Sequence, residues 1–272
     1  DIPQEDYESV EALDNVDVVY GSPVTNQSVF IQTKNVPDVK VRQAMLYAID
    51  RQQILEELLN GHGEIVDGFL SSASPFYDDS LTPVSYDPEK AKEILENAGC
   101  TMDDDGFYER NGEEIGFVIS VMSGEQDRID IAQAAAQQLQ EIGINCTVDI
   151  PAQMDWGGQM ACLIGWGSPF DADDHTYKVF GTDKGANYSS YSNEKVDEYL
   201  SLARQSDDPE VRKEYYGKFQ EELAEDPAYA FICYIDANYV ADSGIQGISK
   251  DTVLGHHGVG IFWNIQDWTI EE

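Results

Sequence analysis

The chain has 272 residues, of which 52 are acidic and 16 basic, and its formal net charge is −36. This excess of negative charge excludes nucleic-acid binding, which needs cationic side chains in place of phosphate counterions, and docking on anionic membranes through a polybasic patch. With 42% hydrophobic and 11% aromatic residues, the chain can bury a large core and is not intrinsically disordered. The acidity therefore indicates a solubilising surface.

Two runs typical of strands, VDVVY and QSVFIQT, occur within residues 16–33 and flank a Gly-Ser-Pro break at residues 21–23. Asp38 is expected to cap a single long helix over residues 39–60, because its apolar residues recur at helical spacing. Residues 63–86 are rich in Ser, Pro, Tyr and Asp and predict a long loop. Loops of this length are usually functional or packed over a partner.

The middle of the chain predicts an α/β unit. An Asp-Pro pair begins a helix over residues 87–98, and Asn111-Gly112 has the composition of a type I′ turn between two strands. A helix near residues 129–142 precedes a strand at residues 144–150. Strand, helix and strand in this order favour a parallel pair with a crossover helix.

The last part of the chain predicts less regular structure. Residues 151–191 combine glycines, aromatic residues and acids with no sustained period. Helices are expected near residues 194–205 and 209–224, followed by a strongly apolar strand, AYAFICYI. Residues 243–272 predict short strands and Gly-rich turns.

Most motifs that carry chemistry are absent. The sequence lacks HExxH, GxSxG, P-loop and GxGxxG patterns, so an enzyme has no positive support and no cofactor is expected. The cysteines form no CxxC motif, and buried thiols are expected rather than disulfides or a zinc site. They are Cys100, Cys146, Cys162 and Cys233.

Two other groups of polar residues resemble metal sites only superficially. Asp103-Asp104-Asp105-Gly106 fails the spacing of a calcium loop and predicts an exposed turn. His256 and His257 would point to opposite faces of a strand, which makes a poor chelating pair.

Residues 165–177 are the strongest candidate for a binding site. Gly167 and Pro169 are expected to shape a loop that presents Trp166 and Phe170 next to several acids, which suits a ligand with apolar and cationic parts. The alternative is a core tryptophan beside a solvated acidic turn. The residues alone leave both interpretations open.

Two long segments carry a resemblance to a known family. They are VRQAMLYAIDRQQILEELLNGHGEIVDGFL and SPFYDDSLTPVSYDPEKAKEILENAG, and the hairpin, the GWG segment and PAYAFICYI follow in the same order. In residue type, order and spacing they are similar to the family 5 solute-binding proteins of ABC importers, the peptide- and nickel-binding group. The similarity covers nearly the whole chain but only the C-terminal half of the usual protein. The opening DIPQED, without an initiator Met, also predicts a piece of a longer protein.

The resemblance implies an α/β fold, the C-terminal lobe of a two-lobed type II periplasmic-binding-protein-like fold. Residues 24–240 would form the ligand-binding lobe, and residues 1–23 and 241–272 would approach or join the N-terminal lobe. It also implies a location outside the cytoplasm, in the periplasm or as a cell-surface lipoprotein. There the protein would close its lobes on a peptide or other small solute and deliver it to ABC permease subunits without breaking any bond.

The resemblance also implies a set of ligand-binding residues. Trp166 matches the tryptophan of the family's GW motif. Pro169 stands where peptide binders carry the aspartate that pairs with the ligand's α-ammonium, and Asp171, Asp173 or Asp174 would replace it with a change of loop geometry. The predicted ligand-binding residues are Trp166, Ser168, Phe170, Asp171, Asp174, His175 and Tyr234.

A peptide is the expected solute. A nickel or metal-chelate importer subunit is the alternative, because WGSPFD is similar to the WGAPYD run of nickel-chelate binders and His175 lies near it. A sensory or chaperone-like surface protein of the same fold is a further alternative, and an unrecognised hydrolase comes last. The chain alone is expected to bind ligand weakly or not at all.

Overall fold

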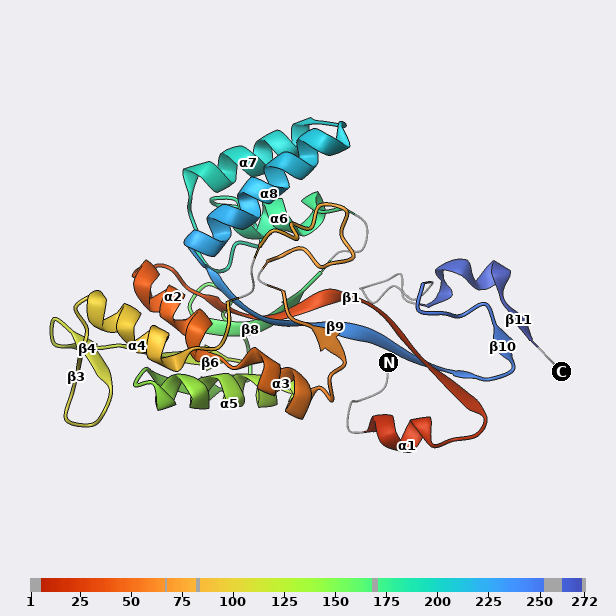
Figure 1. Cartoon of the computed structure of the whole chain (residues 1–272), viewed down its shortest axis with the longest axis horizontal. Helices are drawn as coiled ribbons and strands as arrows, with labels where there is room; N and C mark the ends of the chain where they lie inside the picture. The colour runs from red at the N-terminus through yellow and green to blue at the C-terminus, as the bar shows by residue number, and fades with distance from the viewer. Residues whose placement is uncertain (1–5, 67, 82–83, 168–170, 252–260, 271–272) are drawn as a thin grey trace.

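The computed structural model describes residues 6–66, 68–81, 84–167, 171–251 and 261–270. A six-stranded sheet in the order β2-β9-β1-β8-β6-β7 forms its centre, and a two-stranded ribbon of β1 and β9 extends from one end (Figure 1). The strands of this sheet are β1 (Val16–Ile31), β2 (Gly63–Glu64), β6 (Gly116–Ser120), β7 (Asn145–Asp149), β8 (Ala161–Trp166) and β9 (Tyr229–Asp242).

The helices lie on both faces of this sheet and at its extended end. They are α1 (Tyr7–Glu11), α2 (Val39–Ala48), α3 (Arg51–Leu58), α4 (Pro88–Asn97), α5 (Gln126–Glu141), α6 (Asp173–Phe180), α7 (Glu194–Gln205), α8 (Pro209–Glu225) and the 3-10 helix η2 (Phe262–Asp267). Two small sheets complete the structure: β3 (Thr101–Met102), β4 (Tyr108–Arg110) and β5 (Glu113–Glu114), and β10 (Ile245–Gln246) with β11 (Thr269–Ile270).

The predicted α/β unit is confirmed. Strand β6 pairs in parallel with β7, and α5 makes the crossover between them. Strand β8 adds to the other side of β6, also in parallel, whereas β1 is antiparallel to both β8 and β9. The parallel strands need covering on both faces, which the helices provide.

The break predicted within the first strand region is a bulge, so that prediction was wrong. Strand β1 is continuous, and its pairing with β9 jumps from Gly21 opposite Ala237 to Thr25 opposite Ile235. Pro23, which has no N–H to donate, lies inside this irregularity, where ladder pairing is interrupted anyway. Strand β8 pairs with β1 only from Asn26 onward, so the ribbon beyond the bulge has two strands.

The single helix predicted over residues 39–60 is two helices. At Ile49 the backbone is extended (φ −95, ψ 115), and Asp50 begins α3 as a second N-cap, its carboxylate accepting from the Gln53 N–H at 3.0 Å. The Asp50 N–H in turn donates to Gln138 Oε1 on α5 at 2.8 Å. A cap and a tertiary hydrogen bond therefore outweigh the continuous apolar pattern.

Other local signals act as predicted. The Asp87 carboxylate accepts from the Lys90 N–H at the start of α4, and Gly99 follows that helix with φ +84. Asn111 and Gly112 have φ values of 58 and 80, as a type I′ turn requires. In contrast, β8 and α6 lie within residues 151–191, where no regular structure was predicted.

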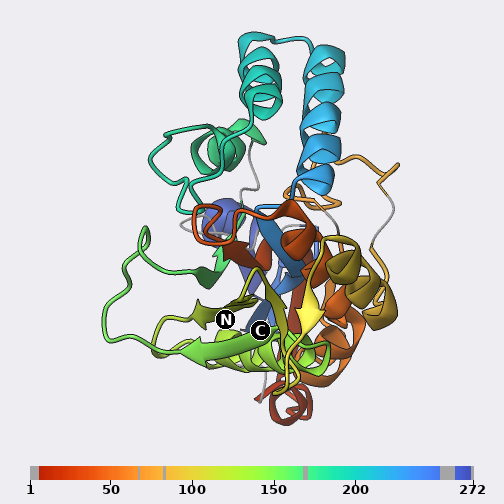
Figure 2. The ribbon, with the colours of Figure 1, turned by 90° about the vertical axis from the view of Figure 1, so that its left-hand side faces the viewer.

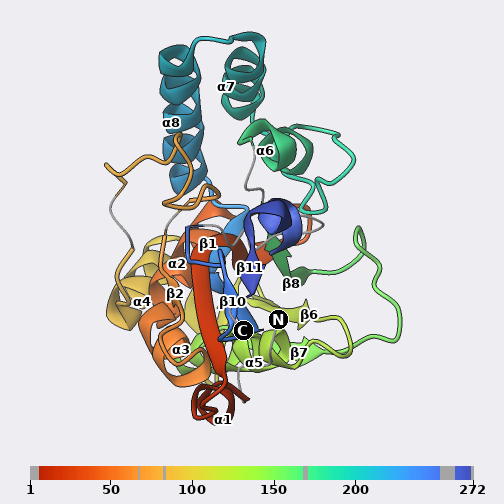
Figure 3. The same ribbon diagram turned by 90° about the vertical axis from the view of Figure 1, so that its right-hand side faces the viewer.

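The sheet separates two cores. Helices α2, α3, α4 and α5 cover one face, and α6, α7 and α8 stand on the other (Figures 2 and 3). Alternation along β1 shows this division, since Val29 and Ile31 belong to the core under α2–α5 and Phe30 to the core under α6–α8. The four cysteines are buried free thiols, as predicted. No helix within the described residues is long and apolar enough to cross a membrane.

Candidate ligand-binding site

Aromatic side chains gather where β8 ends. Trp166, the last residue of β8, is half-buried on the α6 side of the sheet. The His175 ring on α6 meets the indole edge-on at 5.3 Å between centroids, and the Tyr188 ring stacks on it at 6.1 Å. Trp156 stacks on Tyr188 at 5.3 Å. We call Trp156, Trp166, His175 and Tyr188 the Trp166 cluster.

Strand register places two further polar residues in line with Trp166. Trp166 lies opposite Asn26 on β1, and Asn26 lies opposite Tyr234 on β9. Asn26 is fully buried, its side-chain oxygen accepts from the Ser28 hydroxyl at 2.9 Å, and its Nδ2 has no hydrogen-bond partner among the described residues. The sequence analysis missed Asn26, although an asparagine inside an apolar strand is a signal that could have identified it.

Tyr234 is 1% exposed, and its hydroxyl donates to the Phe69 carbonyl at 2.5 Å. Burial raises the pKa of this hydroxyl, so it stays protonated as a donor. This hydrogen bond attaches the loop after β2 to the centre of the sheet. Tyr234 is therefore part of the support beneath the site, two strands away from Trp166.

The predicted acidic residues differ in their surroundings. The Asp171 carboxylate accepts two hydrogen bonds from the Arg212 guanidinium, at 2.6 and 3.0 Å, and these hold the pKa of Asp171 below its usual value. The Asp174 side chain is 52% exposed on α6, with Lys178 Nζ at 3.5 Å and His175 Nε2 at 3.8 Å. Of these two carboxylates, Asp174 is the one beside the Trp166 cluster, through its contact with His175.

The structure thus brings Trp166, His175 and Asp174 together, with Asp171 just before α6. Ser168 and Phe170 lie outside the described residues, as do His256 and His257. The sequence analysis also missed Trp156 and Tyr188, because only the fold brings their separate loops to the end of β8.

Gly165, beside Trp166, has a packing role. A Cβ at this position would lie 2.5 Å from an Arg128 guanidinium nitrogen. Arg128 reaches the sheet from α5, donates to Gln27 Oε1 at 2.8 Å and pairs with Glu125. The glycine of the GW pair therefore admits an arginine to the opposite face of the sheet.

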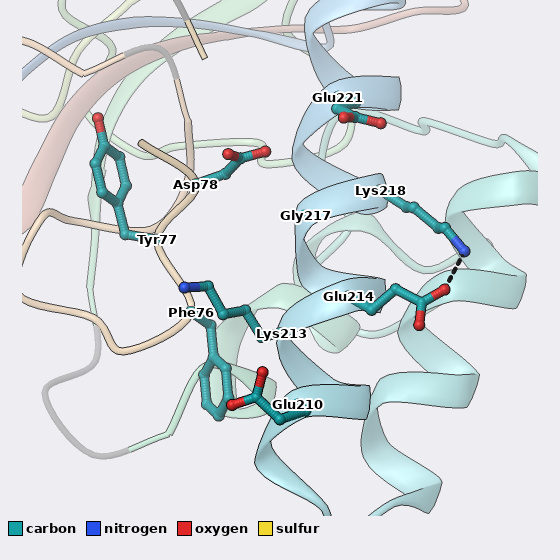
Figure 4. A pocket seen from close by; sticks show the side chains of 9 residues that line it. All are labelled: Phe76, Tyr77, Asp78, Glu210, Lys213, Glu214, Gly217, Lys218 and Glu221. Carbon is teal, nitrogen blue, oxygen red and sulfur yellow. Dashed lines mark hydrogen bonds and ion pairs between the residues drawn. The ribbon is translucent and has the colours of Figure 1, made fainter. Parts of the chain in front are cut away.

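A concave region lies between the loop at residues 76–78 and α8 (Figure 4). Its volume is about 440 Å³, and a Lys218–Glu214 ion pair of 2.5 Å lies along it. It includes no member of the Trp166 cluster. The lining residues are Phe76, Tyr77, Asp78, Glu210, Lys213, Glu214, Gly217, Lys218 and Glu221.

Over the parts of the chain that the structure describes, no three His, Cys, Asp or Glu side chains are grouped so that they could hold an ion. The acidic triplet forms the predicted turn, in which the Asp103 carboxylate accepts from the backbone N–H groups of Asp105 and Phe107.

Comparison with known proteins identifies the family. Residues 1–188 match the family described as bacterial extracellular solute-binding proteins, family 5 Middle. The chain belongs to this family. The oligopeptide-binding protein AppA of Bacillus subtilis (strain 168) is 27% identical over 98% of this chain. The match covers 51% of AppA, so the chain spans about half the length of this curated relative.

Solved structures agree with this assignment and with the predicted α/β fold. NikZ from Campylobacter jejuni, in complex with Ni(L-His), is 31% identical with a TM-score of 0.89, over 98% of this chain and 56% of NikZ. AppA from Bacillus subtilis, in complex with a nonapeptide, is 26% identical with a TM-score of 0.85, over 100% of this chain and 55% of AppA. The curated relative AppA is named for binding oligopeptides and not for a reaction.

Proposed function

We propose that this chain is one lobe of the extracytoplasmic solute-binding component of an ABC importer, and that the Trp166 cluster forms one side of a peptide-binding cleft. The observation that carries this proposal is the Trp166 cluster at the end of β8 in a family 5 chain. Aromatic faces contact varied peptide side chains at low entropic cost, and a nearby carboxylate favours a cationic group.

Five of the seven predicted residues have a part in peptide binding as proposed. Trp166 and Phe170 contact apolar groups, Ser168 donates or accepts a hydrogen bond, and Asp174 faces a cationic group. Tyr234 supports the site from beneath. Closure over the peptide and delivery to the permease follow, with no reaction catalysed by this chain.

The remaining half of the full-length protein supplies the other side of the cleft. Residues 24–240 form the lobe described here, and residues 1–23 and 241–272 contact the other lobe. Support comes from large apolar side chains exposed at the distal end of the ribbon, where Phe262 is 64% and Ile270 is 79% exposed. Apolar surface of this kind is usually covered by a partner surface.

The test is a thermal-shift screen of the full-length protein with a broad peptide library. At least one peptide class should raise the melting temperature, and Trp166→Ala should abolish the shift. No shift across the library would contradict peptide binding. The isolated 272-residue chain should show no micromolar binding, because it offers only one side of the cleft.

A metal chelate is the second candidate solute. It is supported by the similarity to NikZ, whose structure holds Ni(L-His), and by the imidazole of His175 against Trp166. Calorimetry with nickel and histidine, using wild type and His175→Gln, tests it. Saturable binding that His175→Gln removes would favour the chelate, and heats equal to buffer dilution would exclude it.

A further inference from the structure

Arg212 lies at a meeting point of α8 with the segment that follows β8. Its side chain is 17% exposed, and its two terminal nitrogens donate to the two carboxylate oxygens of Asp171 at 2.6 and 3.0 Å. A third, longer contact runs to the Tyr216 hydroxyl at 3.4 Å. Paired, parallel hydrogen bonds from one guanidinium to one carboxylate fix orientation as well as distance.

The same guanidinium also contacts the long loop after β2. Its central carbon lies 4.7 Å from the centroid of the Phe76 ring and 5.6 Å from that of Tyr216. One turn beyond Tyr216 on α8, the Gln220 side chain donates to the Phe76 carbonyl at 3.1 Å. Phe76 is thus held against α8 at one end of the groove in Figure 4.

Asp171 transmits the position of Arg212 to the Trp166 cluster. Besides its pair with Arg212, its carboxylate accepts from the Asp173 N–H at 2.8 Å, at the first residue of α6. Two residues later on that helix, His175 packs edge-on against Trp166 at 5.3 Å. The path from α8 to the cluster therefore consists of one ion pair, one cap-like hydrogen bond and about half a turn of helix, from Asp173 to His175.

We propose that Arg212 is a positioning residue for the ligand site, holding Asp171 and the first turn of α6 so that His175 stays against Trp166. Asp171 then acts as an anchor for α6 and not as the counter-charge of the ligand. The inference rests on the proposed function, because it assigns a role within that site. A lysine ammonium cannot make the paired hydrogen bonds of the planar guanidinium, so Arg212→Lys should keep only part of the ligand affinity that is lost when the arginine is removed.

Charge exchange in the full-length protein tests this role. Asp171→Arg and Arg212→Asp should each weaken binding of the best library peptide at least tenfold, and the double variant should recover most of that loss. The matched control is the Glu214–Lys218 pair on the same helix, whose exchange should change affinity less than twofold. Single variants that bind like wild type would overturn the proposal.

Two forms of one peptide distinguish whether Asp171 anchors α6 or pairs with a cationic group of the ligand. Affinities of Asp171→Asn are measured for one peptide with a free α-amino group and for its N-acetylated form. An anchor predicts that the substitution weakens both by the same factor. A loss confined to the free-amino peptide would show that Asp171 pairs with the ligand and would overturn the proposal.

Hydrogen exchange without ligand keeps this inference distinct from the proposed function. In Arg212→Gln, amides of α6 should exchange at least tenfold faster while those of β6 stay as in wild type, and Arg212→Lys should lie between. Unchanged α6 exchange would overturn the positioning role whatever the protein binds. Faster α6 exchange in a protein that binds no peptide would leave this role standing and reject peptide binding.

Discussion

The two faces of the central sheet differ in kind. The core under α2–α5 is mostly Val, Ile, Leu and Ala, with one Met and three Cys, and Tyr108 and Phe117 are its buried aromatic members among the described residues. The core under α6–α8 is half aromatic, with Phe180 contacting the rings of Phe69, Phe219 and Tyr229. The face under α2–α5 is thus packed mainly with aliphatic side chains, whereas the face under α6–α8 is packed with aromatic rings.

Their polar groups differ in the same sense. Considering only the described parts of the chain, buried side-chain atoms without hydrogen-bond partners include Trp166 Nε1, Asp173 Oδ1, Arg212 Nε and Gln220 Oε1, on or near the α6–α8 face. Within the described residues, α2, α3, α4 and α5 contribute no such atom. Unsatisfied buried groups cost stability and tend to occur where function requires them. The aliphatic face therefore supplies stability, and the aromatic face carries the candidate site.

The largest expected effect is a cavity in the aliphatic core. Leu139 on α5 is fully buried, so Leu139→Ala should lower the free energy of unfolding by about 2–5 kcal/mol in chemical denaturation. Affinity of the folded full-length protein for its ligand should not change. Leu13→Ala, at a site 51% exposed, is the control and should shift stability by less than about 0.5 kcal/mol. A loss of ligand affinity in folded Leu139→Ala would contradict the assignment of stability to one face of the sheet and ligand binding to the other.

The next effect concerns the connection between the faces. Arg42 on α2 is 3% exposed and donates to the Pro227 carbonyl at 2.8 Å, the Val36 carbonyl at 2.7 Å and Asp226 Oδ1 at 2.6 Å. Arg42→Met should cost about 3 kcal/mol because it leaves these acceptors unpaired. Denaturation followed by both tryptophan fluorescence and circular dichroism should give non-coincident transitions. A single coincident transition with wild-type stability would contradict this connection.

In contrast to Leu139→Ala, a substitution of Trp166 should reduce ligand affinity more than it reduces stability. Trp166→Ala should weaken ligand binding by the full-length protein at least tenfold, which corresponds to about 1.4 kcal/mol. Its cost in unfolding free energy should be smaller than that of Leu139→Ala, because the side chain is half-buried and its unpaired N–H is removed with it. Trp166→Phe, which keeps a ring, should retain part of the affinity in the same titration.

The smallest expected effect is a dependence of stability on pH. Burial raises the pKa values of Asp173 and Asp236, so the folded state binds protons more readily than the unfolded state at these two carboxyls. Stability should therefore rise as pH falls through the raised pKa values of these carboxyls, until the same groups are protonated in the unfolded state at about pH 4. Below about 4 it should fall, because the hydrogen bonds from Arg212 lower the pKa of Asp171 and its protonation loses their contribution. Melting temperatures of wild type and Asp171→Asn, measured as a function of pH, check this. The melting temperature of the variant should fall less than that of wild type below about pH 4.

Sequence reasoning worked best where a local signal acts alone. The Asp87 cap, the Asn111-Gly112 turn and α7 were predicted correctly because caps, positive φ and helical spacing depend on neighbours in the chain. It failed at Ile49, where Asp50 and Gln138 divide a helix that the apolar pattern joins. It also missed β8 and α6, which follow each other closely among glycines and acids and show too few periods to be recognised.

The candidate site likewise contains residues that the sequence predicted and residues that only the structure revealed. Trp166, Asp174 and His175 were identified from a single stretch of sequence, and the structure brings them together. Asp171 was predicted as a ligand contact, and that role stays a prediction, although its carboxylate is paired with Arg212. Asn26 and Tyr188 join the site from distant segments, and nothing in their immediate neighbourhood links them to Trp166.

The sequence by itself determined the family, the α/β class and the position of the Trp166 loop, because these follow from the order and spacing of residues along the chain. Only the tertiary structure decided which carboxylates are already paired, which aromatic rings face Trp166, and that the two faces of the sheet differ. Those properties depend on side chains that are distant in sequence, such as Arg212 and Asp171, and that become neighbours only through the packing of α6 and α8 on the sheet.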